Sequence, residues 1–203
     1  MLYFFSKAIL FFILKIGFGL KAHGRENIPA AGALILAANH RSLLDPPVLG
    51  CACPRRLTFI AREDLFSSWP FSRWLRGVGV IALARGSADF SALKEALRRL
   101  KKREALAVFP EGTRSSSGAF GEPLSGVGFL AAKSGALIVP AYIRGTDGAL
   151  PKGARRLRRA GISVYFGPAF SADKGSSYEG IAQEIMRRIR QLAQNSDKES
   201  GVA

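Results

Sequence analysis

The amino-acid sequence predicts an α/β domain, with a largely parallel mixed sheet flanked by helices. Short apolar runs of strand length alternate with longer helical patterns between residues 33 and 194. That alternation is typical of parallel strands joined by crossover helices. Apolar residues make up 48% of 203 residues, enough for the core of one domain. We therefore expect an N-terminal helix over 1–22, a folded domain over 23–194 and a frayed polar tail over 195–203.

The first 22 residues predict a helix that lies in a membrane interface. Lys7 and Lys15 interrupt the apolar sequence, and the longest uncharged run, 8–14, is far shorter than the roughly 20 residues of a membrane-spanning helix. The same lysines break the apolar part that a signal peptide needs, and no cleavage site follows. We expect the aromatic side chains to face lipid and the two lysines to face anionic headgroups. An ordinary buried first helix is the alternative.

The remaining elements follow in chain order. Apolar runs predict strands at 33–39, 57–61, 80–83, 104–109, 136–143 and 161–167. Helical patterns predict helices at 46–53, 67–79, 87–103, 123–135 and 178–194. The first of these helices, 46–53, begins after Asp45. We expect Asp45 to cap this helix, with Pro46 in the first helical position. The helix over 123–135 is expected to end at Gly135.

Charge and cysteine content narrow the possible partners. The net charge of +15 predicts an anionic partner, such as a phosphate-bearing ligand, a membrane surface, an acidic protein or nucleic acid. The basic runs "RRLKKR" and "KGARRLRR" are accompanied by no nucleic-acid module, so no nucleic-acid partner is expected. Cys51 and Cys53 are expected to be reduced and structural, since no set of four ligands for zinc accompanies them. We expect no metal site.

The segment "NHRSLLD", residues 39–45, places one of the two histidines at the end of the first predicted strand. On a continuous helix, His40 and Asp45 would point about 140° apart, so they can meet only if the chain turns between them. A carboxylate would fix the tautomer of a histidine base and stabilise its charged form. The plain alternative is a helix entry without chemistry. Ser42 is a possible nucleophile, but it lacks the Gly-x-Ser-x-Gly elbow.

Other strand ends carry cations. "FPEGTRS", residues 109–115, follows a strand, and Gly112 permits a tight turn from which Arg114 could bind a phosphate through two hydrogen bonds. Arg62 and Arg85 follow two further strands. Each could be a solvated surface charge, but together with His40 they would meet at one edge of the sheet. The "GVGFLA" segment fits a dinucleotide fingerprint only weakly, since no strand precedes it.

Four blocks in order resemble a known family. "NHRSLLD", "GVIALAR", "FPEGTRS" and "IVPAYI" are similar to the conserved blocks of the glycerophospholipid acyltransferases, especially the bacterial 1-acyl-glycerol-3-phosphate acyltransferases. They span residues 39–143, about half of the chain. A single block would be weak evidence, whereas four in the family's order are specific.

The resemblance implies a role for each matching residue. His40 would be the general base, oriented by Asp45. The acceptor's glycerol-phosphate would be held by Glu111, Gly112, Thr113 and Arg114, assisted by Arg85 and by Arg62, which stands where the family usually has lysine. Pro140 would help to shape the acyl-donor side.

The resemblance also implies a reaction. A fatty acyl group would pass from acyl-coenzyme A or acyl-carrier protein to the free hydroxyl of lysophosphatidic acid, giving phosphatidic acid for phospholipid biosynthesis. No cofactor would be needed, and the protein would lie on the cytoplasmic face of the cell membrane, peripheral or monotopic. Two alternatives remain open. One is acylation of another lysolipid, such as lyso-ornithine lipid or a lysophospholipid being remodelled. The other is a basic membrane-surface or nucleic-acid-binding protein without catalysis.

Overall fold

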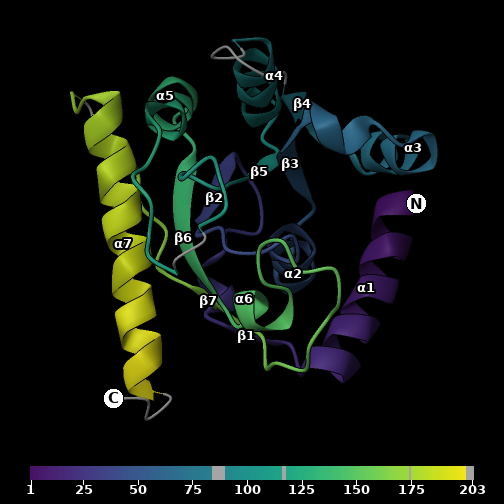
Figure 1. Ribbon diagram of the computed structural model, residues 1–203. Coiled ribbons are helices and arrows are strands. Elements are labelled where there is room, and N and C mark those ends of the chain that lie inside the picture. The colour runs from purple at the N-terminus through teal and green to yellow at the C-terminus, as the bar shows by residue number, and fades with distance from the viewer. Residues whose placement is uncertain (84–89, 116–117, 174, 200–203) are drawn as a thin grey trace.

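The computed structural model describes residues 1–83, 90–115, 118–173 and 175–199, and it contains one mixed sheet (Figure 1). In sheet order the strands are β1 (Lys21–His23), β7 (Ser163–Phe166), β6 (Leu137–Arg144), β2 (Leu34–Ala38), β5 (Ala105–Val108), β3 (Leu57–Arg62) and β4 (Ile81–Leu83). Neighbouring strands are parallel except for β6 and β7, which are antiparallel. The predicted fold class is confirmed.

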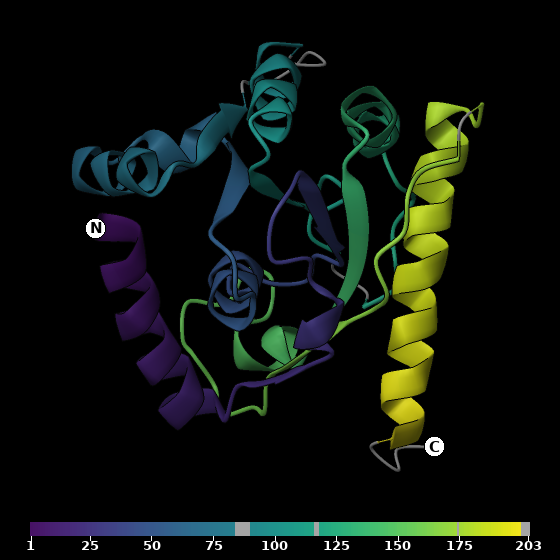
Figure 2. The ribbon, with the colours of Figure 1, turned by 180° about the vertical axis from the view of Figure 1, so that it is seen from behind.

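Helices cover both faces of the sheet (Figures 1 and 2). Their bounds are α1 (Leu2–Phe18), α2 (Asp45–Ala52), α3 (Trp69–Val78), α4 (Phe90–Lys101), α5 (Ser125–Ser134), α6 (Thr146–Ala149) and α7 (Tyr178–Glu199), with 3₁₀ turns η1 (Arg25–Asn27) and η2 (Glu63–Phe66). Side chains alternate across β2: Leu34 and Leu36 pack toward α1 and α2, whereas Ile35 packs toward α4, α5 and α7. The protein therefore has two cores, one on each face.

Each predicted strand and helix is present within a few residues of its expected bounds. Four elements were not expected: β1, a three-residue edge strand, the single turn α6, and the 3₁₀ turns η1 and η2. The last helix also runs to Glu199, five residues beyond its predicted end, and Ser196 is buried in it. A frayed tail from 195 is therefore wrong for residues 195–199, because this part of the helix still packs on the domain. The predicted helix start at 87–89 lies outside the described residues.

A glycine in α5 allows close packing against α7. A Cβ atom on Gly128 would lie 1.9 Å from the carbonyl oxygen of Tyr178, so only glycine fits at this point. Gly126, two residues earlier in the same motif, has no such neighbour: its closest contact would be Leu93 Cδ2 at 3.6 Å. The glycines of "GVGFLA" therefore lie within a packed helix, where Gly128 serves helix–helix contact.

The inner face of α1 is bonded to the body of the protein. The backbone N–H of Leu57 donates to Tyr3 Oη at 3.0 Å, and Trp74 Nε1 donates to Ser6 Oγ at 3.0 Å. Lys7 Nζ donates to the carbonyl oxygen of Cys53 at 2.5 Å, and burial lowers the pKa of this ammonium group. The expectation that Lys7 faces lipid headgroups is wrong, since its side chain lies between α1 and the end of α2.

The outer face of α1 is apolar and exposed. Its exposed side chains include Leu2, Phe4, Phe5, Ile9, Phe11, Phe12, Ile13 and Ile16. The solvent-exposed fractions of Phe5, Phe12 and Ile16 are 68%, 66% and 69%. Residues 5, 9, 12 and 16 recur every three or four positions and so form one stripe along the helix. Within the described part of the chain, no helix combines the length and the apolar character needed to cross a membrane.

Both cysteines are buried and unpaired, as predicted. Burial raises the pKa of the Cys51 thiol to about 11, so the thiol stays protonated and unreactive at neutral pH. Cys51 Sγ lies 3.7 Å from the carbonyl oxygen of Lys7, in the same interface between α1 and α2.

Candidate active site

His40 and Asp45 meet at the carboxyl edge of the sheet. The chain leaves β2 at Ala38, turns over residues 39–44 and enters α2 at Asp45. This turn brings His40 Nδ1 to 2.8 Å from Asp45 Oδ2, as the sequence spacing required. The carboxylate is fully buried, and the His40 side chain keeps 17% of its surface. Because Nδ1 donates its hydrogen to Asp45, Nε2 carries the lone pair of the neutral ring.

Asp45 does not cap α2, which corrects the expected N-cap. It is the first helical residue, and Leu44 precedes the helix as its N-cap. Pro46 and Pro47 have no N–H, so the first turn offers few donors for a capping carboxylate. Asp45 Oδ2 turns back instead and accepts the backbone N–H groups of Arg41 at 2.6 Å and Ser42 at 2.7 Å.

Glu111 holds the backbone rather than facing the solvent. Its Oε1 accepts the N–H of His40 at 3.0 Å, and its Oε2 accepts the N–H of Gly121 at 2.8 Å. The side chain is only 8% exposed. Both carboxylate oxygens are therefore used within the protein, and a phosphate would be repelled by their charge. In the structure Glu111 thus holds the backbone next to His40 in place, and its expected contact with the acceptor stays a prediction.

The "FPEGTRS" loop lies directly beside His40. Ser115 N–H donates to the carbonyl oxygen of His40 at 2.9 Å, so the two loops are bonded on both sides of the histidine. Gly112 has a left-handed φ of 66°, which explains the glycine in this turn. Thr113 is exposed and Arg114 is half-buried. Lys152 Nζ donates to the Arg114 carbonyl at 2.8 Å, which adds a second cation next to this loop.

Arg62 and Arg85 are the two other arginines that were expected to assist in binding the acceptor. Leu57 of β3 lies in register with Ala105 of β5 and, through it, with Leu34 of β2. Arg62, five residues further on, is therefore level with the end of β2. Its side chain is 54% exposed and pairs with Asp64 at 3.1 Å. Arg85 lies outside the described residues.

Pro140 lies inside the sheet. It is in register with Ala37 of β2, and its carbonyl oxygen accepts the N–H of Gly167 at 2.8 Å. Ala141 pairs with Phe166, whereas Ile138 bridges Phe170, so the β7 side has one extra residue opposite Pro140. A proline has no N–H for the ladder, which fits a bulge at this point. Pro140 thus has a place in the sheet, and its expected role on the acyl-donor side stays a prediction.

Several supporting residues were not predicted. Asn39 is fully buried, and its side chain both donates to and accepts from the backbone of Ile143, which fixes the end of β2 on β6. The Phe109 ring stacks on the His40 ring with centroids 4.2 Å apart. Both residues adjoin motif residues in the sequence, but their partners are distant along the chain.

Arg41 packs in an aromatic corner next to His40. Its guanidinium carbon lies 5.2 Å from the ring centroid of Phe120 and 5.8 Å from that of Tyr142, and Nη1 lies 3.5 Å from Asp147. These contacts hold Arg41, the residue after the histidine, from β6, from α6 and from the loop before α5. Among the described residues, no three His, Cys, Asp or Glu side chains group as a metal site would require.

Comparisons with known proteins agree with this geometry. A family model described as Acyltransferase matches residues 19–144, which contain the His40 and Glu111 loops. The chain belongs to the Acyltransferase family. Within this family, the resemblance to bacterial 1-acyl-sn-glycerol-3-phosphate acyltransferases is confirmed by the relatives that follow.

Two bacterial members of the family and one solved structure show the likeness. The chain is 27% identical to "1-acyl-sn-glycerol-3-phosphate acyltransferase" of Bacillus subtilis, over 97% of this chain and 100% of that protein. It is 30% identical to the protein of the same name from Streptococcus pneumoniae, over 88% of this chain and 66% of that one. The crystal structure of "the 1-acyl-sn-glycerophosphate (LPA) acyltransferase, PlsC, from Thermotoga maritima" aligns with a TM-score of 0.81 at 26% identity, covering 96% of this chain and 78% of that one.

Proposed function

We propose that this protein transfers a fatty acyl group from a thioester donor to the free hydroxyl of 1-acyl-sn-glycerol-3-phosphate, giving phosphatidic acid for phospholipid biosynthesis. The observation that carries the proposal is the 2.8 Å contact between His40 Nδ1 and the buried Asp45, beside a loop that carries Arg114. The names of the bacterial relatives support the choice of acceptor.

His40 acts as the general base in this reaction. Its Nε2 takes the proton of the acceptor hydroxyl while the hydroxyl oxygen attacks the thioester carbonyl. The tetrahedral intermediate then breaks its carbon–sulfur bond, and the leaving thiolate takes the proton back from His40. Asp45 stabilises the imidazolium that exists between these two transfers. General-base catalysis of this kind contributes about 10²–10⁴-fold to the rate.

Arg114 binds the phosphate of the acceptor. A guanidinium can donate two parallel hydrogen bonds to a phosphate, and the adjacent cation Lys152 adds positive charge. Acyl-coenzyme A or acyl-carrier protein is the donor, and a thioester needs no cofactor for activation. Gly112 and Thr113 belong to the same acceptor loop.

An acceptor panel tests this proposal. Purified protein with labelled acyl-coenzyme A or acyl-carrier protein should acylate lysophosphatidic acid at least tenfold faster than lysophosphatidylcholine or lyso-ornithine lipid, because only the first offers a phosphomonoester to Arg114. Replacing Arg114 with glutamine should raise KM for lysophosphatidic acid and remove this preference. Equal rates on all lysolipids would contradict the assignment of the acceptor. No transfer to any of them would favour the non-catalytic alternative.

A hydrolase that uses Ser42 fits the structure poorly. Ser42 is fully buried. Its Oγ donates to the carbonyl oxygen of Leu150 at 2.8 Å and accepts the N–H of Leu44 at 3.2 Å. The buried hydroxyl therefore holds two loops together and is engaged in hydrogen bonds on both sides.

The exposed stripe of α1 docks the protein on the cytoplasmic face of the cell membrane. Its aromatic and aliphatic side chains would enter the boundary between headgroups and acyl chains, as in other interfacial helices. This geometry brings the protein to a substrate that resides in the bilayer. Lys7 does not take part as first expected, because it faces the protein, whereas Lys15 is exposed.

Two charged substitutions test the docking of α1. Phe5→Glu combined with Phe12→Glu should reduce the partition coefficient onto anionic vesicles at least a hundredfold, since each change removes a buried phenyl group worth about 1.5–3 kcal/mol. Co-sedimentation with vesicles measures the effect. Phe90→Glu is the matched control, because Phe90 is 78% exposed but belongs to α4. Unchanged sedimentation of the double variant would show that α1 is not the docking helix.

A further inference from the structure

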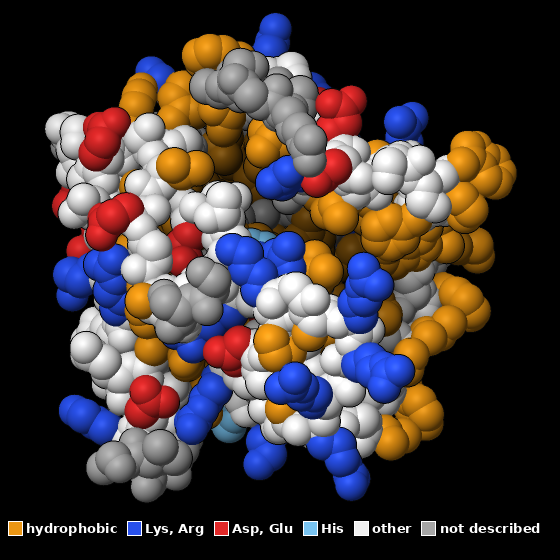
Figure 3. All heavy atoms as spheres, in the orientation of Figure 1, with side chains coloured by type: hydrophobic (Ala, Val, Ile, Leu, Met, Phe, Trp, Pro, Cys, Tyr) orange, Lys and Arg blue, Asp and Glu red, His pale blue; other side chains and the backbone are white. Residues whose placement is uncertain are grey.

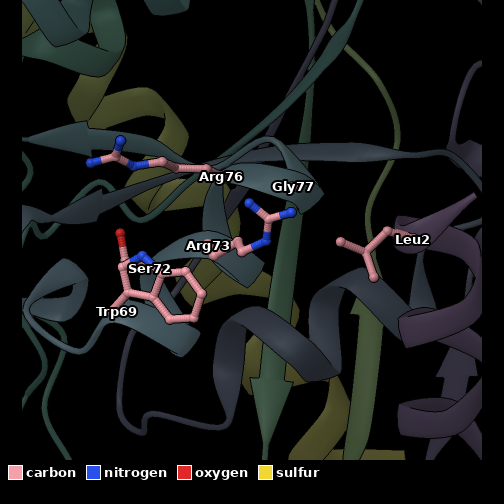
Figure 4. Close-up of a pocket in the computed structure, with 6 residues that line it drawn as sticks. All are labelled: Leu2, Trp69, Ser72, Arg73, Arg76 and Gly77. Atoms are coloured by element: carbon pink, nitrogen blue, oxygen red, sulfur yellow. The ribbon is translucent and has the colours of Figure 1, made fainter.

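A cavity of about 600 Å³ lies between the first turn of α1 and helix α3. Figure 4 shows the residues that line it: Leu2 on α1, and Trp69, Ser72, Arg73, Arg76 and Gly77 on α3. In this view Leu2 points from α1 toward α3, and the Arg73 guanidinium lies between the two helices. None of these residues belongs to the candidate active site, so the cavity needs its own explanation.

The α3 face that lines the cavity combines aromatic and cationic side chains. Trp69, Arg73 and Arg76 are spaced by four and three residues, so they share one face of the helix. Trp69 is 75% exposed, and α3 contains no acidic residue. Over the part of the chain that the structure describes, neither arginine has an ion pair or hydrogen bond through its side chain. Two unneutralised cations beside an exposed indole match an anionic amphiphile.

This face continues the apolar surface of α1. A Cβ atom on Gly77 would lie 2.5 Å from Leu2 Cδ2, so the glycine lets the start of α1 rest on α3. Leu2 begins the exposed stripe that includes Phe5 and Phe12. In Figure 3 hydrophobic side chains gather over α3 and along α1 on the right-hand side of the molecule, with Lys and Arg side chains beside them. The two helices thus present one surface of mixed apolar and basic character.

We propose that α3 is a second membrane-contacting element and that its cavity with α1 seats the headgroup of an anionic bilayer phospholipid. Arg73 and Arg76 bind the phosphate, and Trp69 lies at the boundary between headgroups and acyl chains. This inference rests on the proposed membrane docking of α1 and extends it. Because η2 and α3 follow the carboxyl end of β3, this contact would hold the catalytic edge of the sheet next to the lipid surface.

Fluorescence quenching tests the placement of α3. The protein has two tryptophans, so Trp74→Phe leaves Trp69 as the only indole, and Trp69→Phe leaves Trp74. With vesicles of phosphatidylcholine and phosphatidic acid that carry bromine high on the acyl chains, Trp69 emission should shift to shorter wavelength and fall at least twofold. Trp74, which is partly buried against Ser6, should change little. Unquenched Trp69 in protein that sediments with the vesicles would overturn the proposal and leave the docking of α1 standing.

Charge removal tests the phosphate site. Arg73→Gln combined with Arg76→Gln should lower partition onto the phosphatidic acid vesicles about thirtyfold, and should have little effect with phosphatidylcholine alone. Lys101→Gln with Lys102→Gln is the matched control, since these exposed cations lie before β5, at the opposite edge of the sheet from the candidate active site. An equal loss in both double variants would show a response to net charge only and would overturn the site. Transfer to short-chain lysophosphatidic acid in solution is measured in parallel, so that failure of catalysis and failure of lipid binding are told apart.

Discussion

Replacing His40 with alanine should reduce the rate of acyl transfer by about 10²–10⁴-fold without unfolding the protein. The imidazole Nδ1 lies 2.8 Å from the buried Asp45 carboxylate, and the ring is partly exposed at the edge of the sheet. Loss of the ring leaves Asp45 with two backbone donors, from Arg41 and Ser42, so the loop keeps most of its bonds. Single-turnover transfer from a labelled thioester measures the effect directly.

The second histidine supplies the control for this experiment. His23 stacks on Tyr165 with centroids 4.7 Å apart, on β1 at the edge of the sheet. His23→Ala makes the same chemical change and should leave the transfer rate within about twofold of the parent protein. Asp45→Asn should fall between the two, since an amide keeps an acceptor oxygen but cannot stabilise an imidazolium. Full turnover in the His40 variant would contradict the mechanism.

Replacing Gly128 with alanine should destabilise the protein by about 1–3 kcal/mol or more. The added methyl group would meet the Tyr178 carbonyl oxygen at 1.9 Å, and this oxygen belongs to the backbone, so it cannot rotate away. Relief requires α5 and α7 to move apart, which would open the core that they share. Urea unfolding followed by circular dichroism should show a lower midpoint with an unchanged slope.

Gly126→Ala is the control for this substitution, because it makes the same change on the same helix. The new methyl group would find its closest neighbour, Leu93 Cδ2, at an ordinary distance of 3.6 Å. Removing a helical glycine should then stabilise the protein by up to about 0.5–1 kcal/mol. If both variants lost the same stability, close packing between α5 and α7 would not be the reason for the glycine.

The sequence was sufficient to locate the strand ends that form the candidate site. Strand β2 is a fully buried apolar run, so its end could be read at Asn39, and the chain must then turn before Pro46. These two facts allowed a contact between His40 and Asp45, and the resemblance to the acyltransferase blocks implied it. The groups to which the Asp45 and Glu111 carboxylates bind could not be predicted in the same way. Glu111 takes its two donors from His40 and Gly121, which lie 71 and 10 residues away along the chain.

Elements whose stability depends on distant partners were also missed. Strand β1 has only three residues, two of them exposed, and its ladder is supplied by β7. The position of Lys7 in an apolar segment predicted that its charge faces lipid headgroups. Its partner in the structure is a backbone carbonyl oxygen 46 residues away, at the end of α2. A contact with a distant backbone acceptor cannot be predicted from composition or periodicity.

The pairing of β1 with β7 has a consequence for the order of events during synthesis. Residues 21–23 can form their strand only after residues 163–165, with which they pair, have been synthesised. At about 5–20 residues per second, a ribosome needs roughly 7–30 s to make the intervening chain. Throughout that interval α1 has already emerged with its apolar stripe uncovered. With the proposed docking of α1, the nascent chain would meet a bilayer before its sheet closes and complete folding at the lipid surface.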